Sequence, residues 1–528
     1  MTSNWIRTLL ISSALVTTTL ALSSAAEAGQ CEVLQSLALR GIVLSSVHQD
    51  AQTLAPDPNS LLTGSLPKPL DVPSHCLVEG KIDDRQGVGG SYAVRFQLRI
   101  PDAWNGRFLF QGGGGLDGFL APAVGSIPSL GSSAEPAIKR GYAVASMNGG
   151  HDGNTAEFAA DQQARLDFAY AAIGKVTNAV KAILHAYAGR EPDHSFFMGC
   201  SNGGREAMIA AQRYPTGFDG IIAGNPGFRL SAAAVAQNWD VRQLMAVAPD
   251  GVLSQALTQQ DLDQVSSAVL DSCDALDGLK DGIINAHLEC RFNLDSLHGK
   301  LATNKLDALK AVMAGPQDKA GKALYSPWPV DAGINSPGWR MWKLGTSPSA
   351  QQPNALNVII GAPSLSAVFM TPPQAPRNPM ALDFNKVSQQ TAQMAAMIDA
   401  TSTDLATFSA RGGKMLIFQG LSDPVFSADD ITGWYTQALA DTKGDFARLF
   451  LVPGMTHCGG GPALDNFDPL TALESWVSTG KAPAEMVASG MAFPDKKAPL
   501  CPYPQEAFFT GKDPRSAESY TCRPPKPL

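Results

Sequence analysis

The run Gly199-Cys200-Ser201-Asn202-Gly203-Gly204 contains a G-x-S-x-G pentapeptide. In this motif the glycines remove Cβ atoms that would clash at a sharp turn from a strand into a helix. The serine hydroxyl is thereby left exposed at the turn. The flanks agree, because residues 195–198 are apolar and strand-like and residues 205–213 have a helical pattern. We therefore expect a nucleophile at Ser201; the competing interpretation is a glycine-rich turn with an incidental serine.

A second motif, Met455-Thr456-His457-Cys458, places a histidine directly before a cysteine. A serine hydrolase needs a histidine base within hydrogen-bond reach of its serine. A disulfide holds its two Cα atoms about 5.5 Å apart, so a Cys200–Cys458 bridge would let Ser201 and His457 meet. We predict this bridge; the alternative is two unrelated cysteines.

The acid that orients the histidine is expected between the serine and the histidine in the chain, since this hydrolase architecture has the order Ser, acid, His. Residues 414–420 form a buried-strand pattern, and Asp423 follows in the loop beyond it. Loops at the carboxyl ends of parallel strands are where such sheets build their sites. Asp423 is our candidate, and we expect its rivals Asp429 and Asp430 to lie on a solvated helix face.

Strand and helix patterns alternate along much of the chain, which predicts a largely parallel sheet with helices on both faces. Only residues 225–404 break the alternation, where a minimal hydrolase needs a single helix. We predict an α/β-hydrolase fold with a large lid-domain insertion. The expected division is a catalytic domain of residues 29–226 and 405–528 and a lid domain of residues 227–404.

A glycine run at residues 112–115 follows an early strand and is similar to the HGGG-type oxyanion loop of esterases. Glycines allow the backbone to aim N–H groups at a ligand. We expect the two oxyanion donors to be the N–H groups of Gly114 and Asn202, with Gly113 almost as good a candidate as Gly114. A flexible turn is the alternative.

Composition restricts the partners. The chain has 528 residues, 17% of them charged, and a net charge of −8, which is unfavourable for nucleic-acid binding. Beyond the leader no apolar stretch is long enough to span a bilayer.

Residues 1–28 have the pattern of a signal peptide, with Arg7, an apolar run and Ala26-Glu27-Ala28. We expect cleavage after Ala28 and a secreted or periplasmic protein.

An exported protein can form disulfides, and all eight cysteines follow the predicted cleavage point. Eight cysteines allow roughly a hundred pairings. Position along the chain favours local bridges in addition to the one beside the serine. The predicted pairs are Cys31 with Cys76, Cys200 with Cys458, Cys273 with Cys290, and Cys501 with Cys522.

The Cys-Ser, Asp and His-Cys arrangement resembles that of the tannase and feruloyl esterase family, which includes bacterial mono(2-hydroxyethyl) terephthalate hydrolases. The resemblance covers most of the chain after the leader. It implies a triad of Ser201, Asp423 and His457 whose serine and histidine neighbours form a disulfide. It also implies a carboxylic ester hydrolase that needs no organic cofactor.

The loop Asp274-Ala275-Leu276-Asp277-Gly278-Leu279-Lys280-Asp281-Gly282-Ile283 has three aspartates within eight residues. Calcium prefers carboxylate and carbonyl oxygens, although the spacing is not that of an EF-hand. The loop resembles the structural calcium loop of the family. The ligands that the resemblance implies are the side chains of Asp274, Asp277 and Asp281 and the carbonyls of Leu279 and Ile283. A solvated acidic turn is the alternative.

The expected substrates are small aromatic esters or plant-polysaccharide esters, with feruloyl esterase activity first and tannase activity second. A terephthalate monoester is third, because the resemblance implies a lid arginine and none lies between Lys343 and Arg377. Trp339 and Trp342 form either an aromatic wall of the pocket or part of the lid core. A catalytically silent secreted binding protein and a peptidase are the alternatives from other classes.

Overall fold

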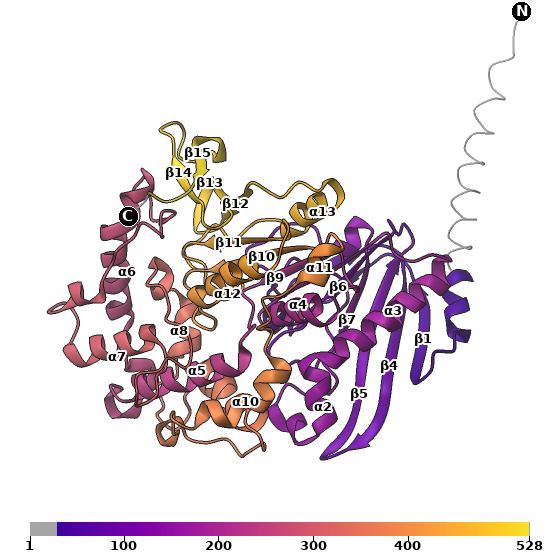
Figure 1. The fold of residues 1–528 in the computed structure, drawn as a ribbon, viewed down its shortest axis with the longest axis horizontal. Coiled ribbons are helices and arrows are strands. Elements are labelled where there is room, and N and C mark those ends of the chain that lie inside the picture. The colour runs from indigo at the N-terminus through magenta and orange to yellow at the C-terminus, as the bar shows by residue number, and fades with distance from the viewer. Residues whose placement is uncertain (1–28, 527–528) are drawn as a thin grey trace, which may run out of the picture.

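A computed structural model describes residues 29–526, and its centre is a nine-stranded sheet (Figure 1). The strand order is β1-β4-β5-β7-β6-β8-β9-β10-β11. From β7 to β11 all neighbours are parallel, whereas β1, β4 and β5 add an antiparallel edge. The bounds are β1 Ile42–Gln49, β4 His75–Gly87, β5 Gly90–Pro101, β6 Arg107–Gln111, β7 Ala143–Met147, β8 His194–Cys200, β9 Gly220–Gly224, β10 Lys414–Gly420 and β11 Ala447–Val452.

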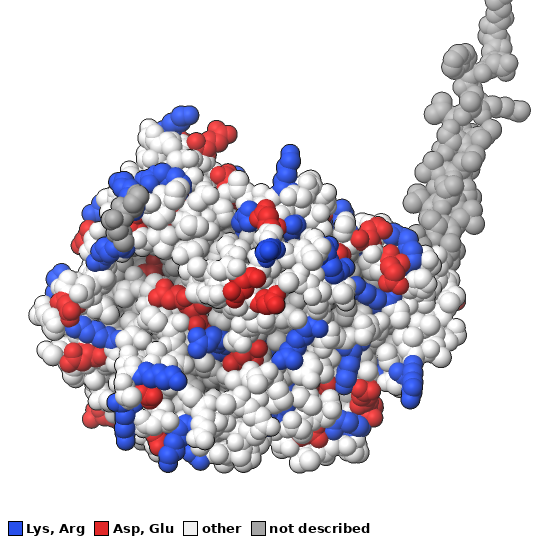
Figure 2. All heavy atoms as spheres, in the orientation of Figure 1, with Lys and Arg blue, Asp and Glu red and all other residues white. Residues whose placement is uncertain are grey.

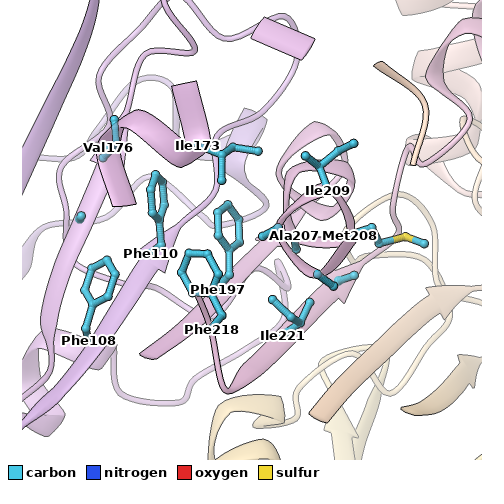
Figure 3. Close-up of a cluster of buried hydrophobic side chains, with 14 of the residues drawn as sticks. Phe108, Phe110, Ile173, Val176, Phe197, Ala207, Met208, Ile209, Phe218 and Ile221 are labelled. Atoms are coloured by element: carbon cyan, nitrogen blue, oxygen red, sulfur yellow. The ribbon is translucent and has the colours of Figure 1, made fainter. Parts of the chain in front are cut away.

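The parallel strands are buried on both faces because helices cover each side of the sheet. On one face Phe110 and Phe197 stack at 4.7 Å between ring centroids, beneath α3 (Ala172–Ala188) and α4 (Asn202–Arg213), as Figure 3 shows. On the other face Phe196 packs in a separate cluster with α13 (Pro469–Thr479). Successive strand residues thus enter opposite cores, which explains the continuous apolar runs.

A helical insertion lies between β9 and β10, and its helices gather beside the sheet in Figure 1. Its hydrophobic core is continuous with Phe158, Phe168 and Phe426 from outside the insertion. The helices are α5 Leu230–Met245, α6 Gln259–Cys273, α7 Thr303–Ala314, α8 Pro337–Lys343, α9 Ala362–Ser364 and α10 Val387–Ile398, followed by α11 Ala406–Ala410 at the return to the sheet.

Smaller elements complete the chain. The described residues hold four disulfides, and they join the four cysteine pairs expected above. The predicted leader and its cleavage after Ala28 lie outside the described residues. The remaining strands and helices are β2 Gln52–Leu54 with β3 Leu70–Val72, β12 Met486–Gly490 with β13 Phe493–Leu500, β14 Glu506–Phe509 with β15 Tyr520–Arg523, α2 Gln162–Leu166 and α12 Ala428–Asp441.

The surface carries charges of both signs. On the face in Figure 2, Lys and Arg side chains are interspersed with Asp and Glu. Within residues 29–526 we find no helix with the length and apolar character that a membrane crossing requires.

Candidate active site

Ser201 lies at the turn between β8 and α4, at the carboxyl edge of the parallel strands. Its backbone φ of 62° is in the left-handed region, which residues other than glycine rarely adopt. The turn is tight, because a Cβ on Gly199 would lie 2.6 Å from the carbonyl carbon of Gly203. The N–H of Ser201 donates to the Gly224 carbonyl at 3.0 Å, which fixes the strained residue against β9. The sequence-predicted nucleophile elbow is therefore present.

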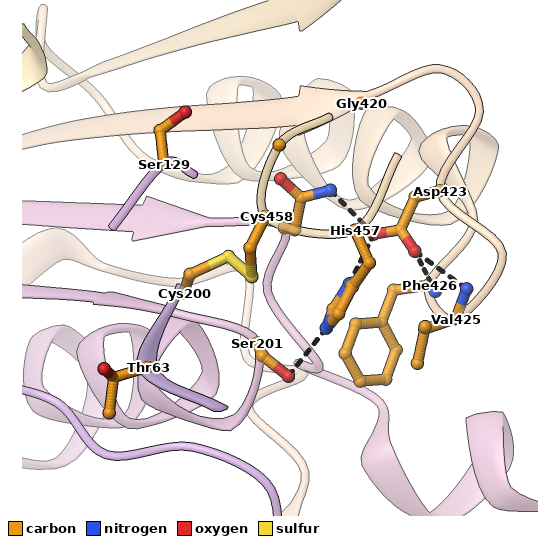
Figure 4. Close-up of a disulfide and its surroundings, with 12 residues drawn as sticks. Thr63, Ser129, Cys200, Ser201, Gly420, Asp423, Val425, Phe426, His457 and Cys458 are labelled. Atoms are coloured by element: carbon orange, nitrogen blue, oxygen red, sulfur yellow. Dashed lines mark hydrogen bonds and ion pairs between the residues drawn. A yellow bond between two sulfur atoms is a disulfide. The ribbon is translucent and has the colours of Figure 1, made fainter. Parts of the chain in front are cut away.

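His457 contacts both other members of the predicted triad (Figure 4). Its Nε2 lies 2.9 Å from Ser201 Oγ, and its Nδ1 lies 3.0 Å from Asp423 Oδ2. Because a carboxylate only accepts, Nδ1 carries the proton and Nε2 is left to accept from the serine hydroxyl. The three side chains thus form a continuous hydrogen-bonded chain from loops far apart in the sequence.

The Asp423 carboxylate is fully buried and receives several donors. Asn225 Nδ2 donates to Oδ2 at 2.7 Å, and the Val425 N–H donates to Oδ1 at 2.7 Å. Burial alone would raise the pKa of Asp423, but the His457 imidazole and these hydrogen bonds lower that pKa below its usual value. Asp423 is therefore an anion at neutral pH, as an orienting partner for His457 must be.

The Cys200–Cys458 disulfide lies directly behind Ser201 and His457 (Figure 4). A segment near the described N-terminus covers it: a Cβ on Gly64 would lie 3.2 Å from the Cβ atoms of both cysteines. The Gly64 backbone has a φ of 80°, so glycine suits this close approach for two reasons. The bridge is enclosed between the active-site loops and this segment.

The glycine loop after β6 has one N–H that is already engaged. The Gly113 N–H donates to Glu206 Oε2 at 2.9 Å, whereas the Gly114 N–H has no acceptor among the described residues. The Asn202 N–H begins α4, where no intrahelical acceptor exists. Gly114 and Asn202 are consequently the better pair of open donors, and Gly113 is the weaker candidate.

Two aromatic rings border the catalytic histidine candidate. Trp342 and Phe426 pack edge-on against the His457 ring, with centroid distances of 5.5 Å and 5.4 Å. Trp342 is half-buried, whereas Trp339 is buried in the core of the helical insertion. The two tryptophans of the same helix therefore have different roles, and only Trp342 lies at the site.

The expectation of a solvated face at residues 429 and 430 is wrong for Asp430. Its side chain is buried, accepts from Arg229 at 2.5 Å and accepts from Ser326 Oγ at 2.8 Å. Asp429 is exposed. Asp430 therefore joins α12 to the insertion, and it is engaged away from His457.

The acidic side chains of the loop at residues 274–283 are paired with protein donors in the structure. Within residues 29–526 no three His, Cys, Asp or Glu side chains are grouped to hold a metal ion. Instead Lys496 Nζ contacts the Asp281 carboxylate, and Asp274 accepts from the Gly282 N–H at 2.9 Å. Asn285 Nδ2 donates to Asp277 at 2.8 Å. Calcium binding here stays a prediction, and no step of the reaction depends on it.

A cavity of about 320 Å³ opens on the other side of the disulfide and touches none of the triad residues. Leu66, Ile127 and Pro136 are among its lining residues. Two of its serines are already engaged, since Ser129 Oγ donates to the Asp465 carbonyl and Ser132 Oγ to the Phe467 carbonyl. The chemistry is thus at the exposed edge of Ser201, not in this cavity.

Sequence reasoning missed the side chains that support the triad. Asn225 follows β9 directly, and Gln419 Nε2 donates to Asp423 Oδ2 at 3.1 Å from the end of β10. Both stand at the carboxyl ends of parallel strands, which is the signal that could have identified them. Glu206 lies one helical turn after Asn202, and this spacing places the two side chains on one face of α4.

Comparison with known proteins finds relatives that match most of the chain. The family model described as tannase and feruloyl esterase matches residues 76–523. The mono(2-hydroxyethyl) terephthalate hydrolase of Piscinibacter sakaiensis is 38% identical, over 86% of this chain and 85% of the relative. A probable feruloyl esterase of Arthroderma benhamiae is 28% identical, over 83% of each chain.

Solved structures confirm the predicted α/β-hydrolase fold. Feruloyl esterase B from Aspergillus oryzae superposes with a TM-score of 0.78 at 21% identity, over 94% of this chain and 100% of that one. The tannin acyl hydrolase from Aspergillus niger gives a TM-score of 0.68 at 18% identity, over 92% of each chain. From the family match and the relatives together, the chain belongs to the tannase and feruloyl esterase family and is a carboxylic ester hydrolase.

Proposed function

We propose that the protein hydrolyses esters of aromatic acids through an acyl-enzyme on Ser201. The observation that carries this proposal is the 2.9 Å contact between Ser201 Oγ and His457 Nε2, backed by Asp423. Ser201 Oγ attacks the ester carbonyl while His457 takes its proton. His457 then protonates the departing alcohol oxygen as the tetrahedral adduct collapses.

Deacylation follows the reverse route. A water molecule gives one proton to His457 and its oxygen attacks the acyl carbonyl. The carbon–oxygen bond to Ser201 then breaks, the acid leaves and Ser201 regains its proton. In both halves the negative charge on the carbonyl oxygen is held by backbone N–H groups, for which we assign Gly114 and Asn202.

The preferred acyl group is a planar aromatic acid of the hydroxycinnamic type, as in a feruloyl esterase. The half-buried ring of Trp342 beside His457 offers an apolar surface for such a group. The printed names of several relatives, probable feruloyl esterases of filamentous fungi, support the same class. Galloyl esters, the substrates of a tannase, share the aromatic acyl part and are included in the test.

A terephthalate monoester is the second candidate, supported by the name of the 38% identical relative. Such a substrate carries a free carboxylate, which a buried site must pair with a cation or strong donors. Lys343 is buried and engaged with Asp240 at 2.5 Å, and no Arg or Lys lies between it and Arg377. Arg377 itself is exposed. The helical insertion thus offers no free cation in this stretch, which favours the hydroxycinnamate.

A matched substrate panel decides between these candidates. Methyl ferulate, methyl gallate and mono(2-hydroxyethyl) terephthalate are compared with the neutral methyl-capped form of the last. We expect the highest kcat/KM on methyl ferulate, and the methyl-capped terephthalate to be preferred over its free acid. Preference for the free acid would favour the second candidate. Cleavage of a peptide substrate without ester turnover would overturn the proposal and favour a peptidase. If neither esters nor peptides are cleaved, the proposal is also overturned, and a binding protein is favoured.

We also propose that residues 227–404 form a lid domain over a catalytic domain of residues 29–226 and 405–528. The insertion has a hydrophobic cluster distinct from the two that flank the sheet, which supports this division, and Phe158, Phe168 and Phe426 join that cluster to the catalytic part. Export to the periplasm or the medium is supported by the four disulfides, which persist in oxidising compartments. A protease cut within the insertion that leaves kcat and KM unchanged would contradict the lid.

A further inference from the structure

Two buried carboxyl groups lie directly behind the oxyanion loop. Asp117 stands at the end of the glycine loop with a φ of 44°, and Glu206 lies on the second turn of α4. Both side chains are almost completely excluded from solvent, and the Asn202 side-chain amide reaches one oxygen of each. Two buried carboxylates held this close cannot both be ionised without a large electrostatic cost, so one of them holds a proton.

The remaining contacts show which oxygens are occupied. Glu206 Oε2 accepts from the Gly113 N–H at 2.9 Å, and Glu206 Oε1 lies 3.5 Å from Asn202 Nδ2. The Asn202 amide also donates to Asp117 Oδ1. Asp117 Oδ2 has no donor within the described residues, although it is buried. An oxygen in that position is satisfied when it carries a proton and donates.

The charges around the pair favour a single negative charge. Arg205 is buried beside it and donates from Nε to Asn202 Oδ1 at 2.7 Å. Burial raises the pKa of both carboxyl groups, far more so for Asp117, and the Arg205 charge opposes the rise. The other charged groups that face Arg205 are Asp399, from the helical insertion, and Arg213, at the end of α4. With Asp399 set against Arg213, Arg205 is left to balance one carboxylate, which we assign to Glu206, and Asp117 is the acid.

We propose that Asp117 and Glu206 share one proton and act together as positioning residues for the oxyanion loop. The Asp117 O–H donates to Glu206, and Glu206 holds the Gly113 N–H so that the Gly114 N–H faces the substrate carbonyl oxygen. This inference rests on the proposed ester hydrolysis. The proton also has an electrostatic effect: two negative charges behind the loop would oppose the negative charge that develops on the carbonyl oxygen.

Infrared spectroscopy tests the proton without any turnover. In protein labelled with carboxyl-¹³C aspartate we expect a protonated-carboxyl C=O band at about pH 9, where an ordinary aspartate is fully ionised. Asp240, Asp399 and Asp429, whose pKa is raised in each case to about 6, are ionised there. The band should vanish in Asp117→Asn. Identical spectra of the parent and Asp117→Asn would overturn the shared proton, even if the protein proved not to be an esterase.

Kinetics test the positioning role. In Asp117→Asn the side-chain amide that replaces the carboxyl group can donate to Glu206 as the acid does, so kcat should stay within about threefold of the parent. Glu206→Leu leaves the Gly113 N–H without its acceptor, and kcat should fall ~10–100-fold with KM little changed. Glu206→Gln keeps an acceptor for Gly113 and should restore most of the loss.

The matched control is Glu506→Gln, at a buried carboxyl group of β14 that accepts from the Leu288 N–H at 2.5 Å and lies against His287, not against a triad residue. It should leave kcat unchanged. A folded Glu206→Leu protein with the parent's kcat would overturn the positioning role. If Glu206→Leu does not fold, a kcat for Glu206→Gln below ~10% of the parent's would overturn it, since Gln retains the acceptor.

Discussion

Cys200 and Cys458 lie with their Cα atoms 6.1 Å apart, and their disulfide joins the residue before Ser201 to the residue after His457. The two cysteines are 258 positions apart, with the whole helical insertion between them. The bridge therefore holds the β8–α4 turn beside the loop that follows β11. Its position suggests a role in catalytic geometry more than in holding the sheet together, because β8, β9, β10 and β11 are already linked strand by strand.

We predict that the double variant Cys200→Ala, Cys458→Ala stays folded but loses kcat by about 10²-fold, since a misplacement of about 1 Å can have this effect. Circular dichroism and steady-state kinetics provide the measurements. The control is Cys501→Ala, Cys522→Ala, which opens the bridge of the C-terminal strands. That control should lower Tm and leave kcat unchanged. Equal kcat in the two double variants would argue against the role of the active-site bridge.

Ser201→Ala should lower ester turnover by about 10⁴-fold or more while the fold is kept, because the covalent step is removed and only the oxyanion donors and binding remain. Turnover of methyl ferulate and near-ultraviolet circular dichroism are measured together. The matched control is Ser195→Ala, at a buried serine near the start of β8, the strand that leads into Ser201. This control should retain the parent's activity. Substantial turnover by Ser201→Ala would exclude the assigned nucleophile.

Calcium should raise Tm by a few degrees relative to chelator, since a ligand at 100 times its Kd stabilises the native state by about 2.7 kcal/mol. Asp277→Asn should abolish this shift, and the exposed Asp271→Asn, which removes the same charge nearby, should retain it. Differential scanning fluorimetry is sufficient. Identical melting of the parent with and without calcium would show that the Lys496 contact, not a metal, neutralises the loop.

The contribution of Asp399 to the free energy of unfolding should decrease as pH rises. Burial raises its pKa from 3.8 to about 6, although Ser231 donates to it and Arg229 and Arg205 lie near. The folded state thus binds the proton more tightly than the unfolded state. The resulting stabilisation is fully present below about pH 4 and is lost as pH rises through about 6.

At one pKa unit per about 1.4 kcal/mol, this loss amounts to at most about 3 kcal/mol. Thermal melts at about pH 4 and about pH 8 should show a smaller decrease for Asp399→Asn than for the parent. Asp271→Asn is again the control, with the parent's pH dependence. A parallel pH dependence in Asp399→Asn and the parent would mean that Asp399 is ionised in the folded protein throughout this range.

The triad residues could be found from the sequence because each lies in or next to a short contiguous motif. Ser201 and His457 each stand next to a cysteine, and Asp423 follows an apolar strand, so local pattern and chain order were sufficient to select them. The parallel strands were predictable for the same reason. Their side chains enter a core on both faces, which requires uninterrupted apolar runs.

Only the tertiary structure decided which polar side chains are buried and what they contact. Asp430 resembles a solvated helix residue in sequence, yet it meets Arg229 and Ser326 of the insertion. Asp117 and Glu206 are 89 positions apart, and nothing local predicts that both meet the Asn202 side chain. A hydrophobic pattern is periodic along one element, so a single sequence reveals it. The partner of a buried charge comes from a distant segment, and its identity is determined only when the sheet and the insertion pack together.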